Sequence, residues 1–454
     1  MQTDGGEGAR ARRGRAAAAL FAAVPIALVL AAGGLSAAAC GTKKGAGAQA
    51  GVDAGGDDGG DDGGIPCDGS GLSKGPLVLH VDGTSALVRW EACREGTPAG
   101  MTYTQEDGGS AQHADAVETP FVTNHTYEAL NAAATPDYAG TWYMHEAELT
   151  GLTQGACYQY GLDVDPTVQA RFCTARNSGD EVRFLAIGDT NPAVGTSTLD
   201  VLSHVLPKNP DFTLHGGDIE YYDSLVETYA LWFQLMKPML RQGAVFAAIG
   251  NHDTDVQQGE PSDKYEQYTE RFFGNAGFDG TPPDAGWASG YYDYESGGIW
   301  FFALDTVQPL DPASVEYQWL VNRLEVVSAQ PGYRFSIVYM HEPFWTCGDT
   351  GDNPATLAQL MPIFAQYKVP LMIQAHMHGY ERFEAPGLTI LTAAGGGGAI
   401  GDVDAGASRA YCSMRVASGG FFNGVIIDVT TGQFTGTTID DQGVVRDSFT
   451  HAVP

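Results

Sequence analysis

The chain has 454 residues and a formal net charge of −31, and this length predicts two folded domains with appended segments. Beyond the N-terminus there is no cluster of Lys and Arg, so binding to nucleic acid or to an anionic membrane surface is not expected. An anionic ligand would need concentrated local positive charge, which a bound metal ion can supply.

Residues 1–39 have the pattern of an export signal, with the basic cluster RARRGR followed by a long apolar run. Small residues just before Cys40 are typical of a bacterial lipoprotein signal, in which this cysteine becomes the lipidated first residue. Ala37 departs from that pattern, because such sites usually carry leucine there. The alternatives are a plainly cleaved signal and an uncleaved anchoring helix, and we favour the lipoprotein.

Residues 40–74 are nearly all Gly, Ala and Asp up to Gly64 and cannot bury enough apolar surface to fold. We expect a flexible, self-repelling tether that holds the folded part away from a membrane. A tether directly after Cys40 supports the lipoprotein interpretation.

Six of the seven cysteines remain when Cys40 is set aside, and an even number in an exported protein predicts up to three disulfides. The sequence alone does not decide how they pair. Cys157 and Cys173 lie in segments that resemble neighbouring strands, so their pairing is the local prediction. By elimination, the other expected pairs are Cys347 with Cys412 and Cys67 with Cys93.

Residues 75–176 contain short segments in which apolar and polar residues alternate, separated by turn residues, such as ALVRWEA and TWYMHEAEL. This period of two is typical of half-buried strands and predicts an all-β sandwich. We interpret Trp90, Tyr158 and Tyr160 as core or corner aromatics. His145 lies inside a strand pattern and is expected to be a packed or surface residue, not a ligand.

From Val182 onward, apolar strand-like segments alternate with helical ones, a pattern that predicts a layered α/β or α+β domain. The expected strands lie at 182–189, 211–218, 244–253, 299–306, 335–342 and 369–378, and the expected helices at 196–206, 225–240 and 315–327. Five of these strands end in Asp, Asn or His, where ligands bind in open α/β sheets. Asp305, at the end of the sixth, is interpreted as a capping or turn residue.

The strand ends supply carboxylate, phenol, amide and imidazole groups in order along the chain. Hard oxygen donors mixed with imidazole suit iron, zinc or manganese. The candidate ligands are Asp189, Asp218, Tyr221, Asn251, His341, His376 and His378.

This ordered series resembles the calcineurin-like metallophosphoesterases, and Tyr221, three residues after Asp218, resembles the purple acid phosphatases in particular. HEAELTGLTQGACYQYGL is similar to the fibronectin type III-like N-terminal domain of that family, and HMHGYERF to a segment of its catalytic domain. The resemblance implies a fibronectin type III-like sandwich over 75–176. It also implies a catalytic α/β domain over 181–454, a layered β-sandwich flanked by helices.

The resemblance also implies the role of each ligand. One metal, Fe³⁺, would be held by Asp189, Tyr221 and His378. The other, Fe²⁺, Zn²⁺ or Mn²⁺, would be held by Asn251, His341 and His376, with Asp218 bridging the two. His252 would donate to the phosphate or to the leaving oxygen, with Asp253 orienting it, and Glu381 and Arg382 would form a structural ion pair beneath the site.

The implied function is an exported acid phosphatase that hydrolyses phosphate monoesters by attack of a metal-activated hydroxide. The alternatives are a metallophosphodiesterase acting on nucleotides or lipid head groups and a non-catalytic surface binding protein. The segment HEPFWTCGDTGDN after His341 lacks the further histidines of plant members, and Asp349, Thr350 and Asp352 are the candidates to replace them. AAGGGG at 393–398 is expected to be a turn, because it lacks the Lys and Ser or Thr of a phosphate-binding loop.

Overall fold

The computed structural model describes residues 70–123, 140–192, 194–221, 230–254, 272–273 and 290–453. The expected signal segment, Cys40 and most of the expected tether lie outside these ranges. Among the described residues, no helix has the length and apolar character needed to cross a membrane.

The N-terminal part of the described chain is built from two antiparallel four-stranded sheets, ordered β1-β2-β6-β5 and β4-β3-β7-β8. An all-β region is therefore confirmed, while its fibronectin type III-like character stays a prediction. Its strands are β1 (Leu72–Leu79), β2 (Ser85–Ala92), β3 (Gly100–Gln105), β4 (Gln112–Asp115), β5 (Val117–Thr123), β6 (Gly140–Thr150), β7 (Cys157–Leu162) and β8 (Ala170–Cys173).

Aromatic side chains fill the core of this β region, as expected. Trp90, Tyr158 and Tyr160 are buried, and the buried His145 ring stacks on Trp90 with centroids 5.4 Å apart. His145 is thus a packed residue. β1 begins at Leu72, before the expected boundary at Gly75. Lys74 lies within this strand, where it is buried and pairs with Glu91.

Two larger sheets form the remainder, with strand orders β11-β10-β9-β19-β20-β21 and β12-β13-β14-β15-β17-β16-β18. Neighbouring strands β9, β10 and β11 are parallel, as are β13, β14 and β15, so the carboxyl ends within each group meet at one edge. The strands are β9 (Val182–Ile187), β10 (Phe212–His215), β11 (Ala244–Ala247), β12 (Tyr292–Ser296), β13 (Ile299–Leu304), β14 (Phe335–Met340), β15 (Leu371–Gln374), β16 (Tyr380–Ala385), β17 (Leu388–Ala393), β18 (Arg415–Gly419), β19 (Asn423–Val429), β20 (Gln433–Asp440) and β21 (Val445–Ala452).

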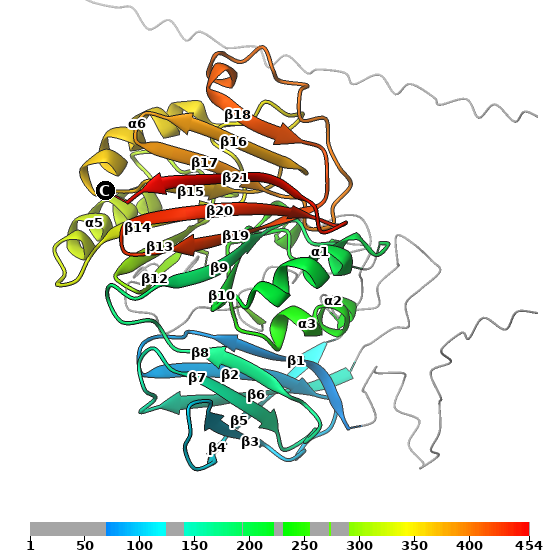
Figure 1. The fold of residues 1–454 in the computed structure, drawn as a ribbon. Helices are drawn as coiled ribbons and strands as arrows, with labels where there is room; N and C mark the ends of the chain where they lie inside the picture. The colour runs from blue at the N-terminus through cyan, green and yellow to red at the C-terminus, as the bar shows by residue number, and fades with distance from the viewer. Residues whose placement is uncertain are drawn as a thin grey trace, which may run out of the picture. The chain divides into compact units, whose positions relative to one another are not determined.

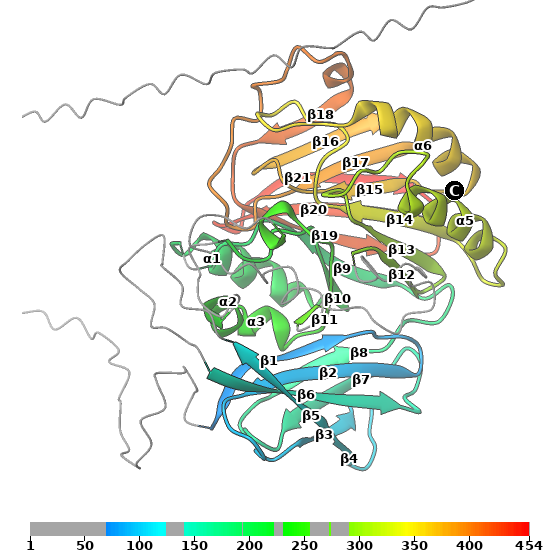
Figure 2. The same cartoon turned by 180° about the vertical axis from the view of Figure 1, so that it is seen from behind.

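The two sheets pack face to face, and helices cover their outer faces. Phe301 of β13 packs edge-on against Phe184 of β9 and Phe212 of β10, with centroids 5.4 and 5.3 Å apart. Figures 1 and 2 show one group of helices beside β9 and β10 and another beside β14 and β15. The helices are α1 (Ser197–Val205), α2 (Ala230–Leu235), α3 (Lys237–Leu240), α5 (Val315–Ser328) and α6 (Pro354–Gln366). This is the expected layered α/β architecture.

Two helical regions differ from the sequence expectation. The helix expected over 225–240 is, in its described part, two short helices that meet at Met236, because Pro238 has no N–H to continue the α-helical ladder. The second difference is α6, which the sequence reading missed because it begins at Pro354 and contains Pro362. Asn353 caps it by accepting a hydrogen bond from the Thr356 N–H at 3.2 Å.

Two expected disulfides are confirmed. Cys157 and Cys173 are directly opposite each other in β7 and β8, and Cys347 bonds to Cys412 across 65 residues of chain. Cys93 is also disulfide-bonded; its expected partner Cys67 lies outside the described residues.

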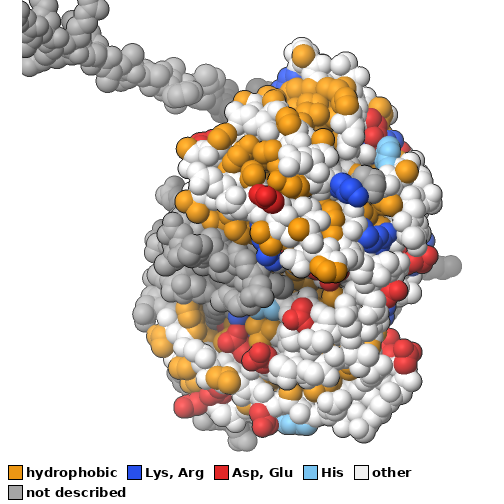
Figure 3. All heavy atoms as spheres, turned by 90° about the vertical axis from the view of Figure 1, so that its left-hand side faces the viewer, with side chains coloured by type: hydrophobic (Ala, Val, Ile, Leu, Met, Phe, Trp, Pro, Cys, Tyr) orange, Lys and Arg blue, Asp and Glu red, His pale blue; other side chains and the backbone are white. Residues whose placement is uncertain are grey.

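The surface in Figure 3 carries Lys and Arg side chains as separate spots among uncharged surface. The described residues visible on this face therefore form no continuous basic patch, and the content of Lys and Arg is low.

Candidate metal centre

Five strand ends from the two large sheets bring the candidate ligands together. Asp189 follows β9, Asp218 and Tyr221 follow β10, and Asn251 follows β11. From the other sheet, His341 follows β14 directly, while His376 and His378 occupy the turn between β15 and β16. The packing of the two sheets thus joins side chains that lie as far apart in sequence as Asp189 and His378.

Three of these residues have a left-handed backbone, with φ of 58° at Asp189, 48° at Asp218 and 66° at His376. Asp and His tolerate this region better than most residues, but it still costs free energy. Such conformations are concentrated at functional sites, where surrounding structure holds them in place. The three strand ends therefore turn sharply to aim their side chains at a common point.

Glycine at 217 is required for the close approach of the turns. Its φ is +90°, and a Cβ there would lie 2.8 Å from the Gly250 nitrogen and 2.9 Å from Nδ1 of His341. A larger residue would push apart the loops that carry Asp218, Asn251 and His341.

One half of the site, the tyrosine half, contains Asp189, Tyr221 and His378. The Tyr221 hydroxyl lies 2.8 Å from Nε2 of His378 and donates to Oδ1 of Asp189 at 3.3 Å. His378 donates from Nδ1 to the Ala399 carbonyl at 2.8 Å, which turns its Nε2 toward the site. Asp189 also accepts from the His376 backbone N–H through Oδ2 at 3.1 Å, so this carboxylate links two strand ends.

The other half, the amide half, contains Asn251, His341 and His376. Nε2 of His341 lies 3.1 Å from Oδ1 of Asn251 and 3.1 Å from Nδ1 of His376. His341 donates from Nδ1 to the Gly216 carbonyl at 2.9 Å, so its Nε2 also faces the site.

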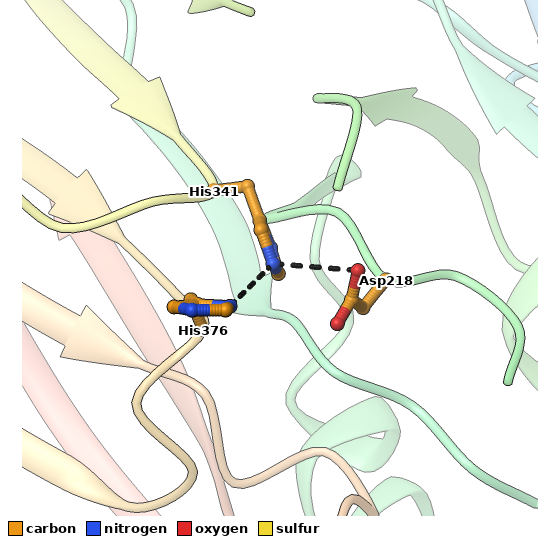
Figure 4. Close-up of side chains that lie close together, drawn as sticks. All are labelled: Asp218, His341 and His376. Atoms are coloured by element: carbon orange, nitrogen blue, oxygen red, sulfur yellow. Dashed lines mark hydrogen bonds and ion pairs between the residues drawn. The ribbon is translucent and has the colours of Figure 1, made fainter. Parts of the chain in front are cut away.

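Asp218 belongs to both halves. It forms one cluster with His341 and His376 and another with Asp189 and His378, and within each cluster the potential ligand atoms lie within 4.8 Å of one another. Figure 4 shows the first cluster, in which Oδ1 of Asp218 is 3.3 Å from Nε2 of His341. Oδ2 of Asp218 is buried and accepts no hydrogen bond. A buried carboxylate oxygen in this state costs free energy unless a cation binds it, so the donor set fits two metal ions.

The charges of the site are strongly coupled. Burial alone would lower the pKa of His341, but the Asp218 carboxylate raises it to about 10. Burial likewise opposes protonation of His378, whose hydrogen bond and charge interaction with Asp189 raise its pKa to about 9. In the metal-free protein two imidazolium groups therefore balance the carboxylates, and bound cations would take over that role.

His252 and Asp253 form the 3₁₀ turn after β11 together with Asn251. The His252 backbone N–H donates to Oδ1 of Asp218 at 2.9 Å, and its ring packs on Tyr221 with centroids 4.6 Å apart. Asp253 accepts from the backbone N–H groups of Ile219 and Gly250 at 3.1 and 2.8 Å, which ties two ligand loops together. Its orientation of His252 stays a prediction.

Glu381 and Arg382 do not form the shared ion pair expected from the sequence. Because they are successive residues of β16, their side chains point to opposite faces of the sheet. Glu381 pairs with Arg415 at 3.0 Å, whereas Arg382 pairs with Asp447 at 2.7 Å. Both ion pairs are structural, as expected, but they are separate.

The glycine run at 393–398 supports the tyrosine half. The Gly398 N–H donates to the Asp189 carbonyl at 2.8 Å, and a Cβ at Gly398 would lie 2.6 Å from the His378 ring. The run is a packing element that lets two strand ends approach, in agreement with the expected turn.

Two residues important for the site were missed from the sequence. His215, at the end of β10, is buried and lies 3.0 Å from the Thr190 hydroxyl through Nε2; burial lowers its pKa to about 4, so it stays neutral beneath the site. Arg409 donates to the carbonyls of Thr346, Gly348 and Thr350 at 2.6, 3.1 and 3.0 Å. No sequence pattern joins Arg409 to a loop so far away in the chain.

The comparisons with known proteins agree with this geometry. Residues 182–380 match the calcineurin-like phosphoesterase family model. Purple acid phosphatase 15 of Arabidopsis thaliana is 24% identical over 277 residues, which cover 53% of this chain and 49% of the relative. Purple acid phosphatase 13 of the same plant is 23% identical over 325 residues, covering 62% of this chain and 57% of the relative. The chain thus spans about half the length of the curated relatives it matches.

Among solved structures, purple acid phosphatase PPD1 from yellow lupin (Lupinus luteus) seeds shares the fold. Its TM-score is 0.64 at 15% sequence identity, with 83% of this chain and 74% of that chain covered. Residues 182–380, which carry all seven candidate ligands, therefore match the calcineurin-like phosphoesterase family, and the chain resembles the purple acid phosphatases in sequence and in fold.

Proposed function

We propose that this chain is an exported acid phosphatase that uses two metal ions to hydrolyse phosphate monoesters. The observation that carries the proposal is the convergence of seven donor side chains. Two clusters of carboxylates and imidazoles share the buried carboxylate of Asp218, and Tyr221 and Asn251 lie 2.8 and 3.1 Å from His378 and His341. A carboxylate shared between two groups of ligands would hold two cations close enough to act on one phosphate ester.

In this proposal the tyrosine half holds Fe³⁺, since phenolate is a hard anionic donor, and the amide half holds Fe²⁺, Zn²⁺ or Mn²⁺. When bound, the two cations would lower the pKa of a water molecule and neutralise charge on the phosphoryl oxygens. Asp218 would hold the two halves together, and the Gly216 and Ala399 carbonyls fix the rings of His341 and His378 for this task.

His252 is the proposed proton donor to the leaving oxygen or to the phosphate. Its backbone is anchored to Asp218 and its ring packs against Tyr221, so the imidazole lies beside the tyrosine half. A positioned imidazole typically contributes about 10²–10⁴-fold to such a step. Asp253 would support it by fixing the turn on which it lies.

The direct test is metal content together with hydrolysis of p-nitrophenyl phosphate. We expect about two metal ions per chain and activity in mildly acidic solution. Asp218→Asn should bind less metal and lose activity by a factor of about 10³ or more, since several kcal/mol of transition-state stabilisation is lost. Asp200→Asn is the matched control, because it makes the same chemical change at an exposed position of α1. Metal-free wild-type protein, or equal activity in both variants, would contradict the proposal.

Monoester preference is a separate expectation. We expect kcat/KM for p-nitrophenyl phosphate to exceed that for bis(p-nitrophenyl) phosphate by about tenfold or more, because a monoester presents an additional anionic oxygen to the two cations. The reverse preference would identify a phosphodiesterase instead.

We also propose attachment to the cell envelope through a lipid on Cys40. Disulfides such as Cys347–Cys412 persist in oxidising compartments outside the cytosol. Wild-type protein should fractionate with membranes, and Cys40→Ser should not. Wild-type protein found only in the soluble fraction would contradict the lipid anchor, and the proposed phosphatase activity would be unaffected by that result.

A further inference from the structure

A pocket of about 420 Å³ opens beside His376, on the amide half of the site. Its walls are the segment 306–310 after β13 and the segments 342–344 and 351–353 after β14. This volume lies within the usual range for small-molecule sites, about 300–1,000 Å³. The pocket therefore adjoins a candidate metal ligand and is large enough for the alcohol part of a phosphate ester.

The pocket is held open by hydrogen bonds within its walls. The Glu342 N–H donates to the Thr306 hydroxyl at 2.7 Å, which joins the two main walls. The Thr356 hydroxyl of α6 donates to the Leu310 carbonyl at 2.9 Å and fixes the far end. The shape is thus preformed, so little conformational entropy would be lost when a ligand enters.

Residues 346–350, which connect the lining segments 342–344 and 351–353, are bonded to the segment 406–412. The Cys347–Cys412 disulfide and the three hydrogen bonds of Arg409 hold residues 346–350 from behind. The Gly406 N–H also donates to the Cys347 carbonyl at 2.7 Å. The loop without histidines after His341 is therefore a rigid wall.

The chemistry of the lining selects against an anionic ligand. Its described residues include apolar side chains such as Leu310 and Phe344, together with the carboxylates of Glu342 and Asp352, and no Lys or Arg is among them. Asp352 accepts from the Tyr411 hydroxyl and pairs with Nε of Arg409 at 3.7 Å, so this carboxylate is fixed at the wall and its charge is partly compensated. A leaving group with further phosphates would meet two carboxylates here, and the described lining offers it no Lys or Arg.

We propose that this pocket receives the leaving alcohol and selects phosphate monoesters of uncharged, partly apolar alcohols over nucleoside polyphosphates. The inference rests on the proposed phosphatase function and names its substrate class. The phosphoryl group would lie at the candidate metal ligands, and the alcohol would extend past His376 between the two walls.

The test compares phenyl phosphate with ATP on metal-loaded protein. Wild-type kcat/KM should be at least tenfold higher for phenyl phosphate, because the carboxylates of the lining repel further phosphate groups. Gln308→Lys, which places a cation on the pocket wall, should raise the ratio of kcat/KM for ATP to that for phenyl phosphate about three- to tenfold. Gln318→Lys on α5 makes the same change on an exposed helix face away from the pocket and should alter neither value.

Equal use of both substrates by wild type, or equal effects of the two lysine variants, would overturn the pocket assignment. If wild type hydrolyses neither ester, the proposed function fails. The assignment of the pocket is then tested separately, by measuring the binding of two phosphonates. Phenylphosphonate should then bind at least fivefold tighter than methylphosphonate by calorimetry, since the ring adds buried apolar area. Equal affinities in that experiment would also overturn the inference.

Discussion

The two halves of the candidate centre differ in their donors and in what surrounds them. The tyrosine half has carboxylate and phenol oxygens and is backed by the glycine run, whereas the amide half depends on two imidazoles and borders the pocket through His376. His341 is fully buried, while the His378 side chain is 22% exposed. On this basis we propose that the two halves would have different roles, in which the tyrosine half would hold its cation more firmly and the amide half would contact the substrate.

Removal of His341 should have the largest effect, and it tests whether the two halves bind metal separately. We expect His341→Ala to lower kcat by about 100- to 1,000-fold and to lose mainly one of the two metal ions, because its imidazole has no replacement in that half. Metal analysis and steady-state kinetics measure both effects. Loss of both ions together, with the protein still folded by circular dichroism, would show that the halves are not separable.

Tyr221→Phe should affect the other half. If Fe³⁺ lies there, the visible absorption of ferric tyrosinate should disappear, and activity should fall about 10- to 100-fold because the ring is kept and only one donor is lost. Absorption spectra of wild type and variant at equal iron content provide the measurement. Persistence of the colour in the variant would exclude Tyr221 as the phenolate ligand.

The two described disulfide pairs sharpen the comparison further. Replacing Cys347 and Cys412 with Ser should raise KM for phenyl phosphate about three- to tenfold with a smaller change in kcat, because the pocket wall loosens while the ligands stay in place. The double replacement of Cys157 and Cys173 is the matched control, since that pair joins two strands of the β region. The control should lose stability by about 2–4 kcal/mol and keep its KM. A rise of KM in the control would refute the local role of Cys347–Cys412.

The smallest expected effect on activity concerns Asp305, which lies at the end of β13 behind the pocket segment. Burial raises the pKa of its carboxyl to about 7, although the Val307 and Gln308 N–H groups donate to it. The folded state therefore binds its proton more tightly than the unfolded state, and stability falls as pH rises from about 4 to about 7. Asp305→Asn should flatten this decline, and urea unfolding midpoints at pH 5 and pH 7.5 would reveal it. An unchanged slope would contradict the buried-acid assignment.

The sequence was sufficient to predict the candidate site but not all of the fold. Asp189, Asp218, His341 and the others follow buried strands, and this local pattern is visible without knowing how the sheets pack. The helix α6 was missed because Pro362 interrupts the expected periodicity. The role of Arg409 depends on packing between distant segments, as does the separation of Glu381 from Arg382, so neither has a local signal.

The strand that carries Asp189 lies between β10 and β19, and β19 comes from the last part of the chain to be synthesised. Ala186, near the end of β9, is paired with Val425, so the strand that precedes the first candidate ligand gains this neighbour only after residue 425 has been made. Metal uptake would consequently follow synthesis of nearly the whole chain, and for an exported protein this places it after translocation. The rate of iron uptake during refolding would thus report the rate of the last folding step.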